Sequence, residues 1–411
     1  MDKHHHLILL SVAVFLLMTG DGIVLALLPK AIITLTGSSG AVWYLAAAYA
    51  LAQVLTQLPV GMLAARWGSK PFIVLGYIVS TIAGLLFYCA QDVHSILAGR
   101  ILQGIGEAPL LSLAPTLLSV RYAADKGKAI GVYNAAIYLG LTLGPLFRVL
   151  VLKDWPDHHF LLLYAIFCFT STLLIGYCLK PYTDNLNTTE EASIPGNCLL
   201  LIKKPQIAAV LWGITLYGAG FGLFMTVIPA FLLTTKDYNQ AGITIFFFYF
   251  YVSISLAQLT IGYLSDWLGR QLFMVTGMLT AAAGIAAAVY FHSIALTLIF
   301  CIASFGLGTY YLASMAFLAE IVPPENKGAI MGFFYLFWGV GMFWGPMLLS
   351  GYIQITDYHS GFQIFSILLI IQATLMLIIP DLARPKRKIH HNVLSLLVIS
   401  PTILYLGSGK I

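Results

Sequence analysis

Apolar residues form stretches of about 20 that follow one another almost end to end, separated by short polar turns. A helix of that length crosses the ~30 Å hydrocarbon layer of a bilayer. The pattern predicts twelve spans, six on each side of one longer polar stretch. They cover residues 7–29, 41–65, 72–90, 95–120, 129–151, 160–179, 206–233, 241–265, 271–291, 294–319, 327–352 and 360–380.

The glycine pattern returns after about half the chain, as a duplication would produce. The pairs are Gly61/Gly262, Gly68/Gly269, Gly140/Gly341, Gly144/Gly345 and Pro145/Pro346 at an offset of 201, and Gly104/Gly306 and Gly106/Gly308 at 202. Matching breakers in matching apolar stretches are typical of transporters with internal repeats. We therefore predict an all-α integral membrane protein of two pseudosymmetric six-helix bundles. Small residues let helices approach closely, so Gly140, Gly144, Pro145, Gly341, Gly345 and Pro346 are expected to pack helices.

The boundaries of the polar stretches divide the chain into four parts. The expected parts are an N-terminal bundle (1–180), a cytoplasmic linker (181–204), a C-terminal bundle (205–380) and a basic and apolar cytoplasmic tail (381–411).

The distribution of charged residues predicts how the chain is oriented in the membrane. Charged residues make up only 9% of the chain, against about 25% in soluble domains. Of the Lys and Arg residues near the spans, fifteen fall on the linker side and only Lys30, Lys153 and Lys236 on the other. Because basic loops stay cytoplasmic, both termini and the linker are predicted in the cytoplasm, with the protein in the cell (inner) membrane. The net charge of +5 then reflects topology, and no nucleic-acid partner is expected.

Two other function classes lack their chemistry in this sequence. An ATP-driven pump needs a glycine-rich phosphate loop, and the one similar segment, Gly407 to Lys410, has Leu404 at the first glycine position. The five cysteines show no metal-ligand spacing, and the histidines form no zinc motif. We therefore predict no enzyme activity, no cofactor and no bound metal.

Two loops at the repeat period carry a family signature. The first reads Gly61-Met-Leu-Ala-Ala65-Arg66-Trp-Gly68-Ser-Lys70, and the second Gly262-Tyr-Leu-Ser-Asp266-Trp-Leu-Gly269-Arg270-Gln271. They resemble the G-x-L-[AS]-D-R-x-G-[RK]-[RK] loop of the major facilitator superfamily, and the resemblance extends over the whole twelve-span region. It implies that Gly61, Arg66, Gly68, Lys70, Gly262, Asp266, Gly269 and Arg270 take part in cytoplasmic gating; the alternative is that these loops only form tight turns. The first copy departs from the motif at Ala65, where the family places aspartate.

The fourth span contains charged residues. Arg100, Gln103, Gly104 and Glu107 share one helical face, and the segment is similar to the family's R-x-x-Q-G-x-G motif. Charges within a span almost always face the protein interior. The resemblance implies that Arg100 and Gln103 bind substrate or assist proton transfer; the alternative is a structural ion pair.

The first span contains one acid, Asp21, and its repeat position is Phe221. The segment Asp21 to Pro29 is similar to the D-x-x-x-x-x-A-L-P motif of drug-exporter branches. Asp21 and Glu107 are the expected proton-coupling residues, because a buried carboxylate can exchange a proton near physiological pH.

The fifth span resembles the start of an exporter motif, G-x-x-x-G-P, at Gly140 to Pro145, although Arg148 and Val149 replace its closing glycine pair. Arg148 either snorkels to the interface or adds positive charge to the substrate cavity. Among the many aromatic residues, Tyr138 and Tyr249 are the candidates to stack on substrate.

The resemblance implies a secondary transporter of a small organic molecule, working by alternating access as a monomer in the lipid bilayer. Proton-coupled export of a multidrug or metabolite type is our first interpretation. Arg100 and Arg148 support an alternative, proton-coupled uptake of an organic anion or siderophore. A transport-inactive membrane sensor is the alternative from another class.

Overall fold

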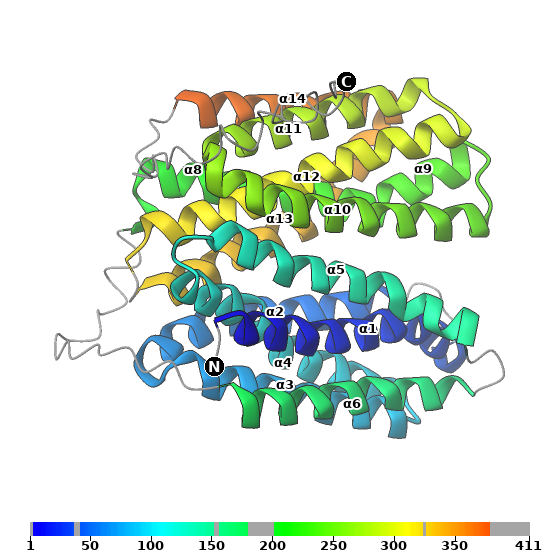
Figure 1. Ribbon diagram of the computed structural model, residues 1–411. Coiled ribbons are helices and arrows are strands. Elements are labelled where there is room, and N and C mark those ends of the chain that lie inside the picture. Colours follow the sequence, from blue (N-terminus) through cyan, green and yellow to red (C-terminus); the bar gives the residue numbers. More distant parts are fainter. Residues whose placement is uncertain (1–2, 37–41, 152–155, 180–200, 324–325, 379–411) are drawn as a thin grey trace, which may run out of the picture.

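The computed structural model describes residues 3–36, 42–151, 156–179, 201–323 and 326–378, and this part is helical without strands. Two bundles of helices lie side by side (Figure 1). The expected linker and tail lie almost entirely outside the described residues.

The first bundle contains α1 to α6. The bounds are α1 Lys3–Thr36, α2 Val42–Trp67, α3 Ser69–Cys89, α4 Val93–Arg121, α5 Lys126–Val151 and α6 Asp157–Leu173, which continues as the π-helical turn η2 Leu174–Cys178. Pro109 and Pro115 lie inside α4 without ending it.

The second bundle contains α8 to α14. The bounds are α8 Pro205–Met225, α9 Val227–Thr235, α10 Gln240–Leu268, α11 Arg270–Ala287, the 3-10 turn η3 Ala288–Tyr290, α12 Ser293–Ile321, α13 Lys327–Ile355 and α14 Tyr358–Ile378. Eleven stretches in the described residues are long and apolar enough to cross a membrane, with α8 and α9 forming one of them. Together with α5 they confirm the predicted twelve-helix class.

The seventh span is broken, where the sequence predicts one helix over 206–233. Thr226 separates α8 from α9 with φ −132° and ψ −62°. Pro229 explains the break, because its ring has no N–H and would clash with the carbonyl of Met225 in a continuous helix. The Thr226 hydroxyl donates to the Gly222 carbonyl at 2.8 Å and so satisfies one backbone group freed by the break.

The expected packing glycines lie at two equivalent helix contacts. A Cβ at Gly144 of α5 would lie 2.3 Å from the Thr19 carbonyl oxygen of α1, and one at Gly341 of α13 only 1.9 Å from that of Thr215 in α8. Gly140 and Gly345 make similar approaches, and the Pro346 ring lies over Gly222. Pro145 belongs to α5, but its side chain lies outside the described part. Glycine is required at these contacts because backbone meets backbone.

The two pairings of α4 with α12 made from the sequence, Gly104/Gly306 and Gly106/Gly308, are wrong. The sequence pairs Gly106 with Gly308, whereas the structure makes Gly306 its equivalent. Gly106 packs on the Gly76 carbonyl and Gly306 on the Gly277 carbonyl, and Gly76 and Gly277 are themselves 201 residues apart. The offset between α4 and α12 is therefore 200. Each helix has two glycines spaced by two, so the sequence allows either alignment and only the packing decides.

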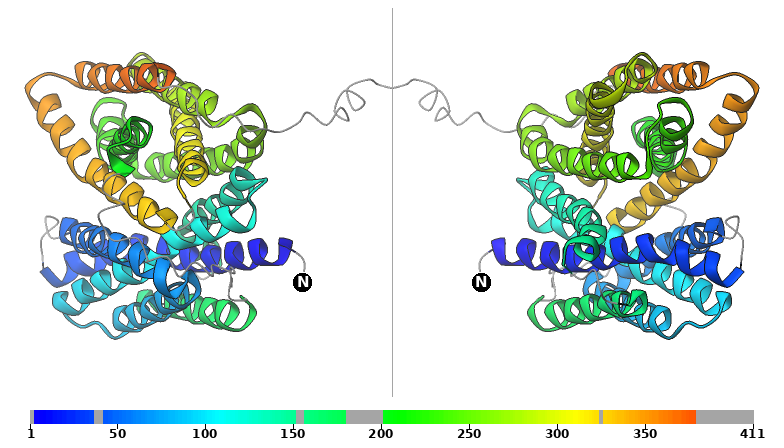
Figure 2. Two further views of the ribbon diagram at one scale, coloured as in Figure 1. Left: turned by 90° about the vertical axis from the view of Figure 1, so that its left-hand side faces the viewer. Right: turned by 90° about the vertical axis from the view of Figure 1, so that its right-hand side faces the viewer.

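We call the end where α2 finishes and α5 begins the linker end, since η2 ends and α8 begins there; the opposite end is the far end. The closest contacts between the bundles lie toward the linker end. They join α2 to α13 and α5 to α10, for example Gly61 with Gly328 and Gly127 with Gly262. Figure 2 shows α13 running obliquely away from this junction.

Candidate functional site

The chemistry-bearing face of α4 is buried. Asp92 begins this helix by accepting a hydrogen bond from the Ser95 N–H at 2.8 Å, and that bond lowers the pKa of its exposed carboxyl. Arg100, Gln103 and Glu107 follow at helical spacing, with 4%, 0% and 0% of their surfaces exposed. The predicted shared face is therefore an interior face, as the cost of charge in lipid requires.

Asp21 of α1 joins this face through one amide. The Gln103 side-chain nitrogen donates to Asp21 Oδ1 at 2.5 Å and to Glu107 Oε1 at 2.9 Å. Arg100 Nη1 donates to Gln103 Oε1 at 2.7 Å and lies 3.9 Å from Asp21 Oδ1. Arg100 thus pairs with Asp21, and a neutral amide links the two carboxylates. We call Asp21, Arg100, Gln103 and Glu107 the polar cluster.

Two tyrosines complete the surroundings of Glu107, and sequence reasoning missed both. Tyr49 of α2 donates to Glu107 Oε2 at 2.7 Å, and Tyr164 of α6 donates to Oε1 at 3.0 Å. Gln53 in turn donates to the Tyr49 hydroxyl at 2.8 Å. Tyr49, Gln53 and Gln57 follow one another at four-residue spacing on α2, so a polar stripe on this otherwise apolar helix is the signal that could have found them.

The contacts of the two carboxylates differ. Each contact of Glu107 comes from a neutral donor, whereas Asp21 faces a guanidinium. Arg100 is held independently of both, because its Nε donates to the Leu45 carbonyl at 3.2 Å and its guanidinium lies 4.8 Å from the Tyr49 ring centre. The cluster therefore combines one paired acid, one acid without a cationic partner and one anchored base.

The second bundle has no equivalent of this cluster among its described residues. At the positions related by the 200-residue offset it carries Phe300, Ala303 and Leu307, and Phe221 replaces Asp21. Phe221 packs against Phe250, with ring centres 5.6 Å apart. At these equivalent positions one bundle has charged and hydrogen-bonded side chains, and the other has buried apolar ones.

Tyr138, a predicted stacking residue, connects the bundles. Its hydroxyl lies 3.1 Å from that of Tyr217, and its ring stacks on Tyr251 with centres 6.4 Å apart. Tyr217 packs on Tyr311 at 4.9 Å, and the hydroxyls of Tyr311 and Tyr335 lie 2.9 Å apart. We call these five residues the tyrosine cluster.

Two other predicted substrate residues are not brought into this group. Tyr249 is 46% exposed, and its ring contacts that of Phe248. Arg148 lies near the end of α5, but its side chain is outside the described part of the chain. The roles assigned to both stay predictions.

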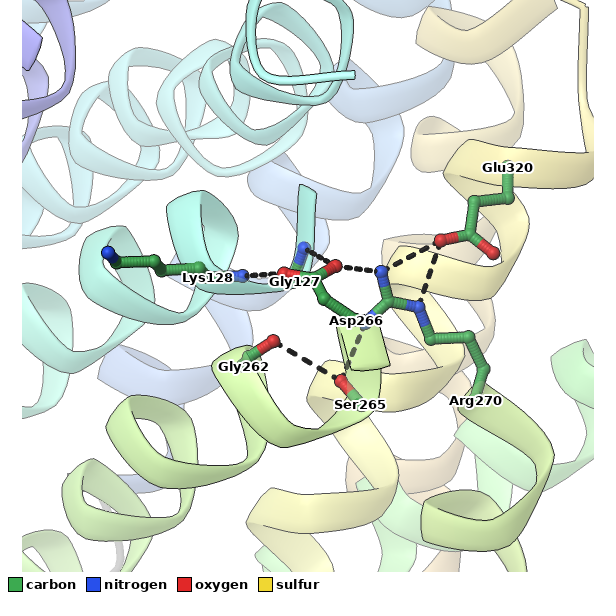
Figure 3. A network of polar contacts seen from close by, with 7 residues as sticks. All are labelled: Gly127, Lys128, Gly262, Ser265, Asp266, Arg270 and Glu320. Carbon is green, nitrogen blue, oxygen red and sulfur yellow. Dashed lines mark hydrogen bonds and ion pairs between the residues drawn. The ribbon is translucent and has the colours of Figure 1, made fainter. Parts of the chain in front are cut away.

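The second signature loop reaches across to the first bundle (Figure 3). The Asp266 carboxylate accepts hydrogen bonds from the backbone N–H groups of Gly127 and Lys128, both at 2.8 Å. It therefore caps the start of α5, where a negative charge is favoured by the helix dipole. This contact between a loop acid and a helix end joins the two bundles.

Arg270 holds that carboxylate in place. It donates to Asp266, to Ser265 Oγ at 2.6 Å and to Glu320 Oε1 at 2.7 Å (Figure 3). Sequence reasoning missed Glu320, although an acid in the last turn of an apolar helix is a visible signal. Burial lowers the pKa of the nearby Lys126, and the Glu320 carboxylate opposes that shift.

The first signature loop forms no matching network in the described residues. Arg66 is exposed, and Lys70 Nζ donates to the Gly176 carbonyl of its own bundle at 3.0 Å. The glycines of both loops are alike: Gly68 and Gly269 have φ of +81° and +97°, which an L side chain rarely adopts. Both loops are tight turns, and among the residues that the structure describes only the second loop carries a charged contact between the bundles.

Comparison with known proteins places this geometry in a family context. The sequence profile of the Major Facilitator Superfamily matches residues 10–254 and 210–407. The uncharacterized MFS-type transporter MJ1560 of Methanocaldococcus jannaschii is 22% identical over 383 residues, which cover 87% of this chain and 94% of that protein.

Two further relatives match over shorter regions. The riboflavin transporter RibZ of Clostridioides difficile is 30% identical over 152 residues, 36% of this chain and 33% of RibZ. Multidrug resistance protein 2 of Bacillus subtilis is 28% identical over 145 residues, 35% of this chain and 36% of that protein. The matched region thus spans about a third of the length of each relative.

Solved structures share the whole architecture. The human organic anion transporter MFSD10 has a TM-score of 0.78 at 15% identity, over 92% of this chain and 100% of that one. The Escherichia coli fucose:proton symporter FucP has a TM-score of 0.78 at 13% identity, over 92% and 99% of the two chains. At these identities the likeness shows the fold alone.

Proposed function

This chain belongs to the major facilitator superfamily, and from that premise we propose that it is a proton-coupled exporter of amphipathic organic molecules. The observation that carries the proposal is the polar cluster: two buried carboxylates joined by Gln103, only one of them paired with a base. Phe221, which stands at the repeat position of Asp21 in the opposite bundle, supports an apolar substrate body.

Glu107 is the proposed proton carrier. Its carboxylate is fully buried and accepts hydrogen bonds from Tyr49, Gln103 and Tyr164, all of them neutral. An unpaired charge in a span is costly, by about 2.5–3.5 kcal/mol at the membrane centre. Binding a proton removes that cost, and opening toward either side lets water restore the charged form.

Asp21 is the proposed competitor for substrate. It shares the Gln103 amide with Glu107 and lies 3.9 Å from Arg100. A cationic or hydrogen-bonding group that approaches Asp21 would draw Gln103 and Arg100 away from their present contacts. Because Gln103 bonds both acids, substrate at Asp21 changes the stabilisation of charge on Glu107, and this is the coupling that exchange of substrate for a proton requires.

The linker end is the proposed gate that closes during substrate exchange at the far end. Asp266 bridges the bundles by capping α5, and Arg270 and Glu320 fix its orientation. The tyrosine cluster would form the second barrier, between this gate and the polar cluster.

Uptake of an organic anion is the second candidate, and Arg100 favours it. However, Arg100 already bonds Gln103 and lies beside Asp21, so an anion has to displace an internal acid. The structure therefore offers less support for anion uptake than for export.

The coupling is tested by the sign of a pH change in proteoliposomes that contain an internal pH dye. Riboflavin and ethidium are suitable first probes, because both have flat aromatic bodies and ethidium cannot itself carry a proton. Entry of the probe by proton antiport should raise the internal pH, and entry by symport should lower it. Transport without any pH change would contradict proton coupling, and protein-free liposomes control for leakage.

Orientation is a separate prediction, which rests on the bias of basic residues. We expect the linker end to face the cytoplasm. A cysteine at Ile355, which is 85% exposed at the far end, should react with a membrane-impermeant maleimide on intact cells, and one at linker position Asn187 should react only after lysis. Position 355 is preferable to Asp357, because Asp357 caps α14 through the Ser360 N–H at 2.7 Å. The reverse labelling pattern would overturn the orientation.

A further inference from the structure

The repeat places two equivalent contacts at the linker end. We call them the α2–α13 seam and the α5–α10 seam. A Cβ at Gly61 would lie 2.4 Å from the Gly328 carbonyl oxygen, and one at Gly262 would lie 2.6 Å from that of Gly127. Gly61 and Gly262 are repeat partners, as are Gly127 and Gly328, at an offset of 201. The two seams therefore start from the same backbone contact.

One helical turn farther from the linker end, the two seams are again aligned with each other. A Cβ at Gly131 would lie 2.2 Å from the Gln258 carbonyl oxygen, and one at Gly332 would lie 3.0 Å from that of Gln57. These four residues again form repeat pairs. Because the backbones match, any difference in strength between the seams comes from their side chains.

The side chains of the α5–α10 seam bind across it. Asp266 accepts two backbone hydrogen bonds from the start of α5. Deeper in the seam, Asn134 Nδ2 lies 3.4 Å from Gln258 Oε1, and Gln258 Nε2 donates to the Gly308 carbonyl at 3.3 Å. The seam is thus held by a charged cap and by a buried amide contact, in which Asn134 Oδ1 has no hydrogen-bond partner but both side-chain atoms of Gln258 do.

Neither kind of contact is found in the described part of the α2–α13 seam. Position 65, the repeat partner of Asp266, is an alanine, and α13 begins without a side-chain cap. The partner of Asn134 is Tyr335, whose hydroxyl is engaged by Tyr311 within its own bundle.

Gln57 shows the consequence of these two replacements. It is the repeat partner of Gln258 and is fully buried, yet neither its Nε2 nor its Oε1 has a hydrogen-bond partner. A buried polar group without a partner disfavours the state that buries it. The closed α2–α13 seam is therefore weakened by Gln57, whereas the other seam is strengthened by the equivalent residue.

We propose that the linker end opens first at the α2–α13 seam, with the α5–α10 seam serving as the hinge. This inference rests on the alternating-access function proposed above. It implies that substrate passes the linker end between α2 and α13, and that Gln57 gains hydrogen-bond partners from water once the seam parts.

The test restores the missing cap. Ala65→Asp places a carboxylate at the repeat position of Asp266, and Gln57→Leu removes the unbonded amide without changing the backbone. Hydrogen–deuterium exchange of the full chain in lipid nanodiscs reports on both seams. In the wild type, segments 54–61 and 328–339 should exchange faster than segments 127–138 and 258–266. Each substitution should slow exchange at the α2–α13 seam by about fivefold, which corresponds to the ~1 kcal/mol of a helix cap.

Matched controls test whether slower exchange at the α2–α13 seam could come from an added charge anywhere in this turn or from the loss of any buried amide. Trp67→Asp adds the same charge at a 68% exposed position of the same turn, and Gln372→Leu removes another buried amide, between α14 and α8. Neither should slow exchange at the seam. The proposal would be overturned if both seams exchanged hydrogen for deuterium at the same rate, or if neither Ala65→Asp nor Gln57→Leu slowed exchange at the α2–α13 seam. Transport itself would still be observed in that case. Failure of both seams to open, with no transport of any probe, would instead refute alternating access itself.

Discussion

Replacing Glu107 with glutamine is expected to reduce uphill transport strongly while leaving the protein folded. Glutamine has nearly the same shape: its carbonyl oxygen at the place of Oε1 still accepts from Gln103 and Tyr164, and its NH2 group at the place of Oε2 can donate to the Tyr49 hydroxyl oxygen, but it cannot release a proton. Accumulation driven by a pH gradient should fall about 5–150-fold, the factor that corresponds to a coupling free energy of about 1–3 kcal/mol. The measurement is probe accumulation in inverted vesicles, with an imposed pH gradient and without one.

In Glu107→Gln, the exchange of labelled for unlabelled probe across the membrane should persist when no pH gradient is imposed, because the substrate contacts proposed at Asp21 remain. Asp21→Asn should weaken probe binding as well as coupling. Asp92→Asn provides the matched control: it makes the same chemical change at the exposed cap of α4, where asparagine is also a good cap. Wild-type accumulation in both cluster variants would rule out proton coupling through these acids.

Adding a methyl group at Gly61 or Gly131 is expected to force the linker end open. The Cβ of an alanine would lie 2.4 Å from the Gly328 oxygen in the first case and 2.2 Å from the Gln258 oxygen in the second. Backbone atoms cannot move aside as a flexible side chain would. Overpacking of this kind costs about 1–3 kcal/mol, which should shift the closed-to-open ratio about 5–150-fold.

Hydrogen–deuterium exchange at the two seams measures that shift. Binding of the probe from the far end is a second measure, and it should decrease as the linker end opens. Gly351→Ala is the control, because it lies in α13 and has no atom within 4 Å of the added methyl. If Gly61→Ala and Gly131→Ala behave like Gly351→Ala, the glycine contacts do not determine closure of the linker end.

The sequence predicts the architecture well, because membrane solvation acts locally. A backbone in lipid must satisfy its own hydrogen bonds, so each apolar stretch of sufficient length becomes a helix. The break at Thr226 is the exception, and the cause, Pro229, is itself local. The shared face of Arg100, Gln103 and Glu107 follows from helical spacing in the same way.

The partners of those residues could not be predicted from the sequence. Spans that meet both lipid and protein can be apolar on every side, because no hydrophobic difference drives one face inward. Their rotations are set by contacts between helices far apart in the chain. For this reason Tyr49 and Tyr164 were missed around Glu107, as was Glu320 beside Arg270, and the register of α4 against α12 was wrong by two residues.

The sequence by itself determined the twelve helices, their duplication and the acid of the second signature loop, because hydropathy, glycine spacing and helical periodicity are properties of neighbouring residues. Only the tertiary structure decided that Gln103 joins Asp21 to Glu107, and that Gln57 is left without a partner while its repeat mate Gln258 has two. Those outcomes depend on the angles and rotations at which helices pack, and these are fixed by close backbone contacts such as Gly61 with Gly328.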